Sequence, residues 1–137
     1  MSNIGVYQDK VSQLVDTMKP MEQVHAPVVN RFAPGVYIRE IFMPAGSVIV
    51  GKVHMTEHFN IVLSGSVQLS NEDGTTTRIE APCTFVSKAG VRKVLYCETD
   101  VVWQTIHPTD KTDEEELTTD LVVDTPEEYE RRLEWRG

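Results

Sequence analysis

The sequence of 137 residues predicts one all-β domain, a small closed barrel with a short helix before it and an acidic helical tail after it. Short Val- and Ile-rich runs recur about every ten residues between Gly35 and Pro108, and turn residues separate them. One of these turns carries Asp73-Gly74, a strong hairpin signal. Helical spacing of apolar residues occurs only outside this region. These observations favour a β-sandwich or barrel over a parallel α/β sheet.

The N-terminal segment is predicted to be a helix followed by an irregular arm. Apolar residues lie at helical spacing from Val6 to Met18, which predicts one short amphipathic helix. Residues 21–34, which include Pro27 and Pro34, are predicted to be irregular. Residues 1–34 therefore form the N-terminal helix and arm.

Residues 35–108 form the predicted barrel of about eight strands. The expected strands are 36–42, 47–54, 59–63, 66–70, 75–80, 83–87, 93–98 and 101–107. The acidic C-terminal tail, residues 109–137, is expected to hold a short helical or extended piece at 113–123. Thr125-Pro126-Glu127-Glu128 then starts a helix, with Thr at the N-cap, Pro at the first helical position and Glu at the third. The three segments are expected to make one domain overall.

Composition narrows the function classes. A net charge of −8 argues against a protein that tracks a nucleic-acid backbone. No apolar run is long enough for a membrane span, and no signal peptide is visible, so we expect a cytoplasmic protein. Cys83 and Cys97 lack a CxxC spacing and are expected to be free thiols. No nucleophile elbow, P-loop or dinucleotide-binding glycine motif is present.

The stretch from Gly51 to Gly65 carries the candidate site. Lys52 and His54 lie two residues apart and share one face of a strand, and His58 and Asn60 can rejoin that face after a turn at 55–57. Histidine is the commonest neutral metal ligand, and two histidines four residues apart can share one ion. This pattern predicts a polar wall inside the barrel.

Other candidates lie outside this polar wall. Glu57 and His107 are candidate additional metal ligands, and Lys93 is a candidate cavity cation. Tyr96 and Trp103 are interpreted as barrel packing that could also stack on a planar ligand. Arg39 and Glu40 are interpreted as a surface pair.

The region from Gly35 to Pro108 resembles the cupin superfamily, which implies a cupin-like jelly-roll barrel. The first cupin motif reads His-x-His, three or four residues, Glu, six residues, Gly. Counting back from Gly65 puts His58 at the position of the Glu, His54 at the second His and Lys52 at the first. In the second motif, Pro-x-Gly-x-x-His, Gly90 matches the glycine, while Lys88 and Lys93 replace the proline and the final histidine. An alternative register makes Glu57 the acidic ligand.

The resemblance implies a cavity that binds a ligand, and it leaves the kind of ligand open. In one interpretation His54 and His58 bind a divalent metal (Fe, Mn, Ni or Zn) with Glu57, Glu40 or His107 completing the shell. In the other, the same two histidines and the lysines Lys52 and Lys93 form a metal-free pocket for a small anionic molecule, because close lysines disfavour a bound cation.

Three functions follow from these interpretations. The first is a binding protein, similar to small cupin proteins of tailed bacteriophages that would act in the host cytoplasm. The second is a metal-dependent lyase, isomerase or dioxygenase. The third is an acidic module that engages a host protein through residues 109–137. A homodimer is expected in each case, because sheet edges are readily covered by pairing.

Overall fold

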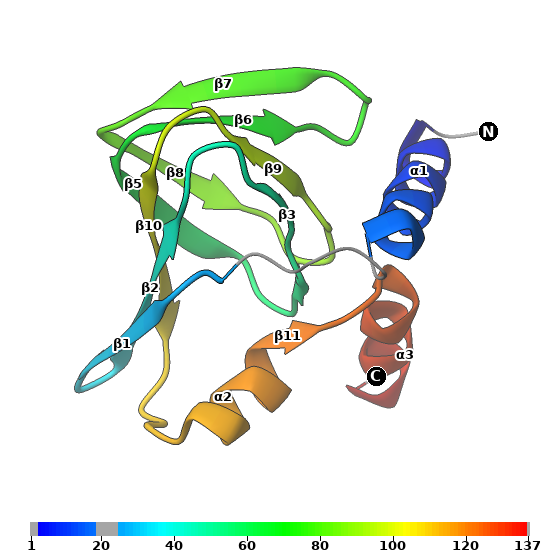
Figure 1. Cartoon of the computed structure of the whole chain (residues 1–137). Coiled ribbons are helices and arrows are strands. Elements are labelled where there is room, and N and C mark those ends of the chain that lie inside the picture. The colour runs from blue at the N-terminus through cyan, green and yellow to red at the C-terminus, as the bar shows by residue number, and fades with distance from the viewer. Residues whose placement is uncertain (1–2, 19–24, 137) are drawn as a thin grey trace.

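The protein folds as a two-sheet antiparallel barrel, with α1 (Asn3–Met18) and α3 (Pro126–Arg136) on one side of it and α2 (Glu114–Leu121) at the bottom in Figure 1. The computed structural model describes residues 3–18 and 25–136. The larger sheet has five strands in the order β1 (Val28–Ala33), β2 (Val36–Met43), β10 (Val101–Pro108), β5 (His58–Ser64) and β8 (Cys83–Ser87). The smaller sheet has four strands in the order β3 (Val48–Val50), β9 (Val94–Cys97), β6 (Ser66–Ser70) and β7 (Thr76–Glu80).

A short two-stranded sheet joins the barrel to the C-terminal segment. It pairs β4 (Val53–His54) with β11 (Val122–Val123), so that Val122 lies opposite His54 and Val123 opposite Val53. β11 directly follows helix α2 (Glu114–Leu121) and precedes helix α3 (Pro126–Arg136). This pairing brings the tail back onto the barrel.

The main core lies between the two larger sheets. It contains side chains of both sheets, all at most 8% exposed: Met43, Val62, Val67, Leu69, Ile79, Cys97, Val101 and Trp103. Side chains alternate in and out along a strand, which is why every second residue of β10 enters this core or the cavity beside it. A smaller cluster of Val53, Met55 and Val123, with Tyr129 against it, fixes the C-terminal segment.

The turn between β5 and β6 requires a glycine. Gly65 has a φ of +92°, and a Cβ there would lie 2.1 Å from the carbonyl oxygen of Asp100. A left-handed backbone and this close approach both exclude a side chain. The glycine from which the cupin motif was counted therefore has a structural role.

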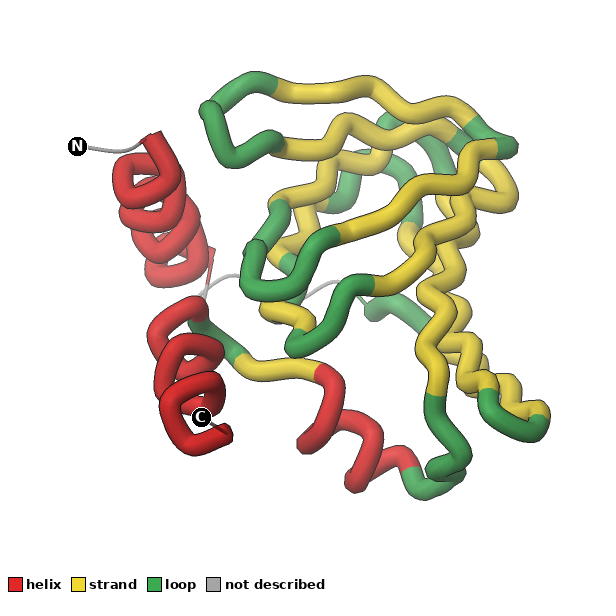
Figure 2. Tube along the Cα trace, turned by 180° about the vertical axis from the view of Figure 1, so that it is seen from behind, coloured by secondary structure: helices red, strands yellow, loops and turns green. Residues whose placement is uncertain are grey.

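Helix α1 (Asn3–Met18) is attached to the small sheet through one tyrosine. The Tyr7 hydroxyl donates to the carbonyl of Arg92 at 2.8 Å and lies 2.6 Å from the Ser70 hydroxyl oxygen. Tyr7 and Val11 are both buried. Figure 2 shows α1 and α3 next to each other on the same side of the strands. Within the described residues, no helix is long and apolar enough to cross a membrane.

Most elements agree with the sequence predictions, with two exceptions. The strand expected at residues 47–54 is divided into β3 and β4, which belong to different sheets. The hairpin at Asp73-Gly74 joins β6 and β7, and the Glu128 amide donates to Thr125 Oγ1 at 3.2 Å as the predicted N-cap requires. The prediction of an irregular arm was wrong for residues 28–33, which form β1 with six paired positions along β2. Residues 21–24 of that arm lie outside the described residues.

Candidate functional site

A cavity of about 410 Å³ opens between the sheets and holds most of the predicted site residues. Its apolar floor is formed by side chains from both sheets: Ile41, Met43, Ile49, Leu69, Phe85, Leu95 and Trp103. Its upper wall is polar and contains Arg39, Lys52, His54, His58, Asn60, Ser87, Lys93, Thr105 and His107. Helix α2 and β11 close one side, with Leu117, Leu121 and Val122 facing the cavity. A volume of this size suits a small metabolite.

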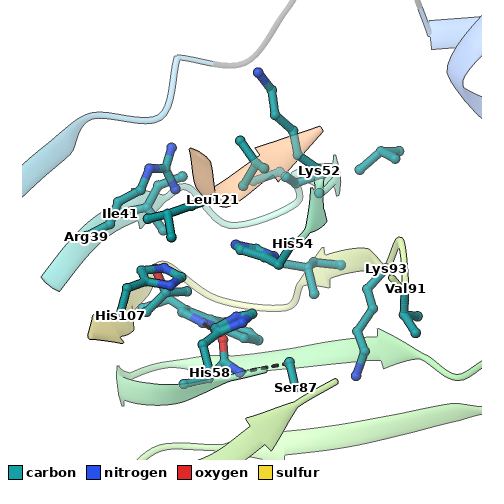
Figure 3. Close-up of a pocket in the computed structure, with 18 of the residues that line it drawn as sticks. Arg39, Ile41, Lys52, His54, His58, Ser87, Val91, Lys93, His107 and Leu121 are labelled. Atoms are coloured by element: carbon teal, nitrogen blue, oxygen red, sulfur yellow. Dashed lines mark hydrogen bonds between the residues drawn. The ribbon is translucent and has the colours of Figure 1, made fainter. Parts of the chain in front are cut away.

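Three histidines from three different strands meet in the polar wall. His54 lies on β4, His58 on β5 and His107 at the end of β10. The ring centroids are 4.1 Å apart for His54 and His58, 4.9 Å for His58 and His107, and 5.6 Å for His54 and His107. Figure 3 shows the three imidazoles pointing toward one another.

The backbone at His54 is held from two sides. Its carbonyl accepts a hydrogen bond of 3.0 Å from the Gly90 amide, and its strand pairs with β11. Gly90 has a φ of +84°, and a Cβ there would lie 2.6 Å from the ring of Tyr129. The glycine of the second motif therefore allows α3 to pack close to the strand that carries His54.

The hydrogen-bond partners of the other two rings show which of their nitrogen atoms are free. His58 Nδ1 lies 3.1 Å from the carbonyl oxygen of Thr56. Because a carbonyl only accepts, Nδ1 carries the proton and the Nε2 lone pair of a neutral His58 is free. His107 Nε2 contacts Thr105 Oγ1 at 3.2 Å, whereas His107 Nδ1 is buried and has no hydrogen-bond partner among the described residues. A buried polar atom without a partner is an expected position for a ligand.

All three histidines are neutral at pH 7. Burial is the main cause that lowers the pKa of His54 to about 3 and that of His107 to about 4, and the nearby histidines and Arg39 contribute to both of these values. Burial also lowers the pKa of His58, and the charge of Lys93 adds to this effect. Both desolvation and a neighbouring cation disfavour the imidazolium.

Three of the four cations that line the cavity form no ion pair. These are Arg39, Lys88 and Lys93, within the part of the chain that the structure describes, whereas Lys52 lies 3.6 Å from Asp124. Figure 3 shows Arg39 and Lys93 on opposite sides of the three imidazoles. Burial lowers the pKa of Lys93, whose ammonium lies 6.0 Å from the centroid of the Phe85 ring.

Asn60 connects the polar wall to the floor. Its amide nitrogen donates to Ser87 Oγ at 2.8 Å, and its amide oxygen accepts from the Trp103 indole at 3.0 Å. Trp103 meets Phe85 edge to face, with centroids 5.5 Å apart. A buried indole N–H needs such an acceptor, so Asn60 orients the aromatic floor.

The structure brings six of the eight predicted site residues to the cavity: Lys52, His54, His58, Asn60, Lys93 and His107. The other two lie elsewhere. Glu57 is exposed just before β5 begins at His58, and it does not line the cavity. Tyr96 is 43% exposed, since Leu95 is the residue of β9 that faces inward.

Arg39 is a cavity-lining residue that the sequence analysis did not place at the site. Arg39 is exposed, but the expected pairing of Arg39 with Glu40 was wrong, because adjacent residues of β2 face opposite sides of the sheet. Arg39 lines the cavity, while Glu40 pairs with Arg31 at 3.3 Å on the outer face. The alternation of Tyr37, Arg39 and Ile41 was the signal that could have found it.

The cavity offers imidazole nitrogens as possible metal ligands. Neutral imidazoles are the form that binds divalent metals, and the free Nε2 of His58 and the unpartnered Nδ1 of His107 suit this role. However, no group of three or more His, Cys, Asp or Glu side chains within residues 3–18 and 25–136 is placed to hold a metal ion. The donor chemistry therefore fits a metal, but the arrangement of the donors does not.

The architecture and the cavity define a small cupin-like jelly-roll barrel. No family model matches the sequence, and no curated protein matches it either. Solved cupin structures do match the fold. A cupin superfamily protein from Desulfitobacterium hafniense is 10% identical with a TM-score of 0.53, covering 65% of this chain and 82% of that protein. A cupin domain from Bordetella pertussis is 18% identical with a TM-score of 0.51, covering 65% and 98%.

An enzyme also contains this fold. Salicylate 1,2-dioxygenase from Pseudaminobacter salicylatoxidans is 15% identical with a TM-score of 0.54. The match covers 75% of this chain but 32% of that enzyme. At these identities the similarity shows the fold alone.

Proposed function

We propose that this protein binds a small organic anion in the barrel cavity. The anionic group would lie between Arg39 and Lys93, and the apolar part of the molecule would lie on the floor around Trp103. The observation that carries the proposal is one cavity lined by cations that form no ion pair, Arg39 and Lys93 among them. Lys93 is partly buried, and an anionic ligand offsets the cost of its desolvation.

The charge of the cavity differs from that of the whole protein. The chain has a net charge of −8, yet four cations and one carboxylate, that of Glu114, line the cavity. Arg39 and Lys93 also lower the pKa values of the histidines beside them, as a positive potential does. Neutral histidines add hydrogen-bond donors without adding charge, so they complement an anion that also has polar groups.

The floor favours a ligand with an apolar or aromatic body. Phe85 and Trp103 supply two rings, and aliphatic side chains supply the rest of the floor. Pockets that combine an apolar floor with a few placed polar groups are typical of small-molecule sites. The chemical class is therefore a carboxylate or phosphate attached to a compact apolar group.

Calorimetric titration with benzoate and with its neutral counterpart benzamide tests the proposal. We expect benzoate to bind and benzamide to bind at least about 10-fold more weakly, because the charge-assisted contacts are lost. Arg39→Gln and Lys93→Gln should each weaken benzoate by a similar factor. Lys10→Gln, on the exposed part of α1, is the matched control and should leave the affinity unchanged. Equal affinities for benzoate and benzamide would contradict the proposal. So would the absence of binding by both benzoate and hexanoate, which is an aliphatic carboxylate.

A divalent metal held by two of the histidines is the second candidate, since no three donors among the described residues are placed to share one ion. It is favoured by the buried Nδ1 of His107 without a partner and by the neutral state of all three rings. Such a metal (Fe, Mn, Ni or Zn) would supply a Lewis acid, and the lyase, isomerase or dioxygenase alternatives depend on it. Elemental analysis of untagged protein, with His54→Asn/His107→Asn as the matched sample, tests it. About one equivalent lost in the variant supports this candidate, and no metal in either sample contradicts it.

The role of the protein in a host cell is proposed from its sequence alone. The resemblance to small cupin proteins of tailed bacteriophages supports an accessory role in the host cytoplasm. Two free cysteines accord with a reducing compartment. The acidic residues after Thr109 support contact with a host protein as an alternative role.

A further inference from the structure

Among the lysines that line the cavity, Lys93 is the one withdrawn from water. Lys52 and Lys88 line the cavity too, but both are exposed, whereas Lys93 is half-buried. The ammonium nitrogen of Lys93 lies 6.0 Å from the centroid of the Phe85 ring, which belongs to the apolar floor. Lys93 forms no ion pair within the described residues. Its amine therefore faces the ligand space without a carboxylate that would favour the charged form.

The backbone on both sides of Lys93 is held by hydrogen bonds. The Lys93 carbonyl accepts a hydrogen bond of 2.9 Å from the Gly51 amide, and the Val94 amide donates to Ser70 Oγ at 2.9 Å. Strand β9 begins at Val94, and Leu95 lines the cavity. Side chains two residues apart share one face of a strand, which is why Lys93 and Leu95 both face the cavity. The amine is therefore presented to a ligand from a fixed backbone position.

The surroundings of Lys93 favour the chemistry of a nucleophile. Burial lowers the pKa of Lys93, and the charge of Glu72 opposes this effect only in part. A lysine in an apolar pocket loses its proton more readily than one in water, because desolvation disfavours the ammonium. The uncharged amine is the form that attacks a carbonyl carbon.

The position of Arg39 restricts which carbonyl compound can react. Figure 3 shows Arg39 and Lys93 on opposite sides of the three imidazoles, whose ring centroids are 4.1–5.6 Å apart. A ligand whose carboxylate pairs with Arg39 therefore meets Lys93 with its other end. A carbonyl next to the carboxylate, as in a 2-oxo acid, does not span this separation. The substrate class is an aldehyde or ketone whose carboxylate lies at the opposite end of a compact apolar body.

We propose that Lys93 forms a Schiff base with a carbonyl compound of this class. The inference rests on the ligand site proposed above, because Arg39 holds the carboxylate. The nitrogen of the uncharged amine attacks the carbonyl carbon, and a C=N bond replaces the C=O bond. The carbonyl oxygen leaves as water with the two protons of the amine, so the step needs no oxidant, reductant or cofactor. Hydrolysis of the C=N bond releases the carbonyl compound again.

Reductive trapping with 4-formylbenzoate and cyanoborohydride at pH 7 tests the proposal. Cyanoborohydride reduces an imine to a stable secondary amine, so a labelled lysine gains the mass of the aldehyde less one oxygen atom. Peptide mass spectrometry of the unmodified protein then gives the labelling rate of each lysine. We expect Lys93 to be labelled at least about 10-fold faster than Lys10, the exposed lysine of α1, because each unit of lowered pKa raises the uncharged fraction about tenfold. Lys93→Arg should remove the fast adduct, and Lys10→Arg is the matched control that should keep it.

Three comparisons test the role of the carboxylate, with the rate at Lys10 as the internal reference. The preference for Lys93 should be at least about 10-fold lower with neutral benzaldehyde, because the charge-assisted contact with Arg39 is lost. Arg39→Gln should lower the preference for 4-formylbenzoate by a similar factor. Glyoxylate, in which the aldehyde adjoins the carboxylate, should show a smaller preference for Lys93 than 4-formylbenzoate does.

Two results would overturn the proposal. One is labelling of Lys93 by 4-formylbenzoate no faster than that of Lys10. The other is a preference for Lys93 that is unchanged in Arg39→Gln. If benzoate binds in the calorimetric titration while Lys93 is not labelled preferentially, the Schiff base fails and the ligand site stands. Preferential labelling of Lys93 that excess benzoate does not slow contradicts the ligand site instead and leaves the reactive amine in place.

Discussion

Lowering the pH from 7 to 5 should destabilise the fold through its buried histidines. In the unfolded chain a histidine titrates near its ordinary pKa of 6.5, whereas burial holds the pKa of His54 at about 3 and that of His107 at about 4. Between these values the unfolded state binds protons that the folded state does not. The free energy of unfolding is therefore highest above pH 6.5 and falls as the pH drops toward the two folded-state pKa values.

The size of the effect follows from the two shifts. At pH 5, which is roughly 1.5 units below the pKa of an unfolded histidine, protonation stabilises the unfolded chain by about 2 kcal/mol per residue. His54 and His107 together therefore remove about 4 kcal/mol, out of a typical total of about 5–15 kcal/mol for a native domain.

Urea titrations at pH 7, 6 and 5 in the presence of EDTA measure this loss. In the double variant His54→Asn/His107→Asn, the drop in the free energy of unfolding between pH 7 and pH 5 should be smaller by most of those 4 kcal/mol. His25→Asn is the control, because His25 is exposed and should leave the slope as in the unmodified protein. Identical pH dependence in the double variant and the unmodified protein would refute the argument that these two rings are buried and neutral.

Three further substitutions test the packing around the site. Asn60→Ala leaves the buried indole N–H of Trp103 without its acceptor and should cost about 1–3 kcal/mol in urea unfolding, and a loss below 0.5 kcal/mol would contradict that role. Gly65→Ala places a Cβ against the carbonyl of Asp100 in a left-handed backbone, so the variant should lose about 3 kcal/mol or more or fail to fold, and a stable variant would exclude this geometry. Thr125→Ala removes the N-cap of α3 and should cost about 1 kcal/mol by thermal melting, with Thr125→Ser as a control that retains the cap.

The sequence was sufficient for the barrel and for most of the polar wall, because both depend on local patterns. Strand alternation puts His58 and Asn60 on one face regardless of how the strands pair. Turn chemistry at Asp73-Gly74 and the cap at Thr125 are likewise local, and both predictions are confirmed.

The remaining features depend on contacts between distant segments. β1 was missed because prolines flank it and because its stability comes from six pairs with β2. Helix α2 begins with three glutamates, which are typical of a solvated face, so its role in closing the cavity was not predicted. The spacing of Leu117 and Leu121 was the available sign that one face of this helix is covered.

The strands that carry the site have apolar side chains on both faces, and their alternation decides which side chains reach the cavity. His58 lines the cavity while Phe59, the next residue, is exposed on the outer face of the sheet. A shift of one residue in the pairing of β5 would exchange these faces and would put Phe59 into the cavity. The register of β5 against β10, with Ile106 opposite Phe59, is therefore a requirement of the proposed ligand site.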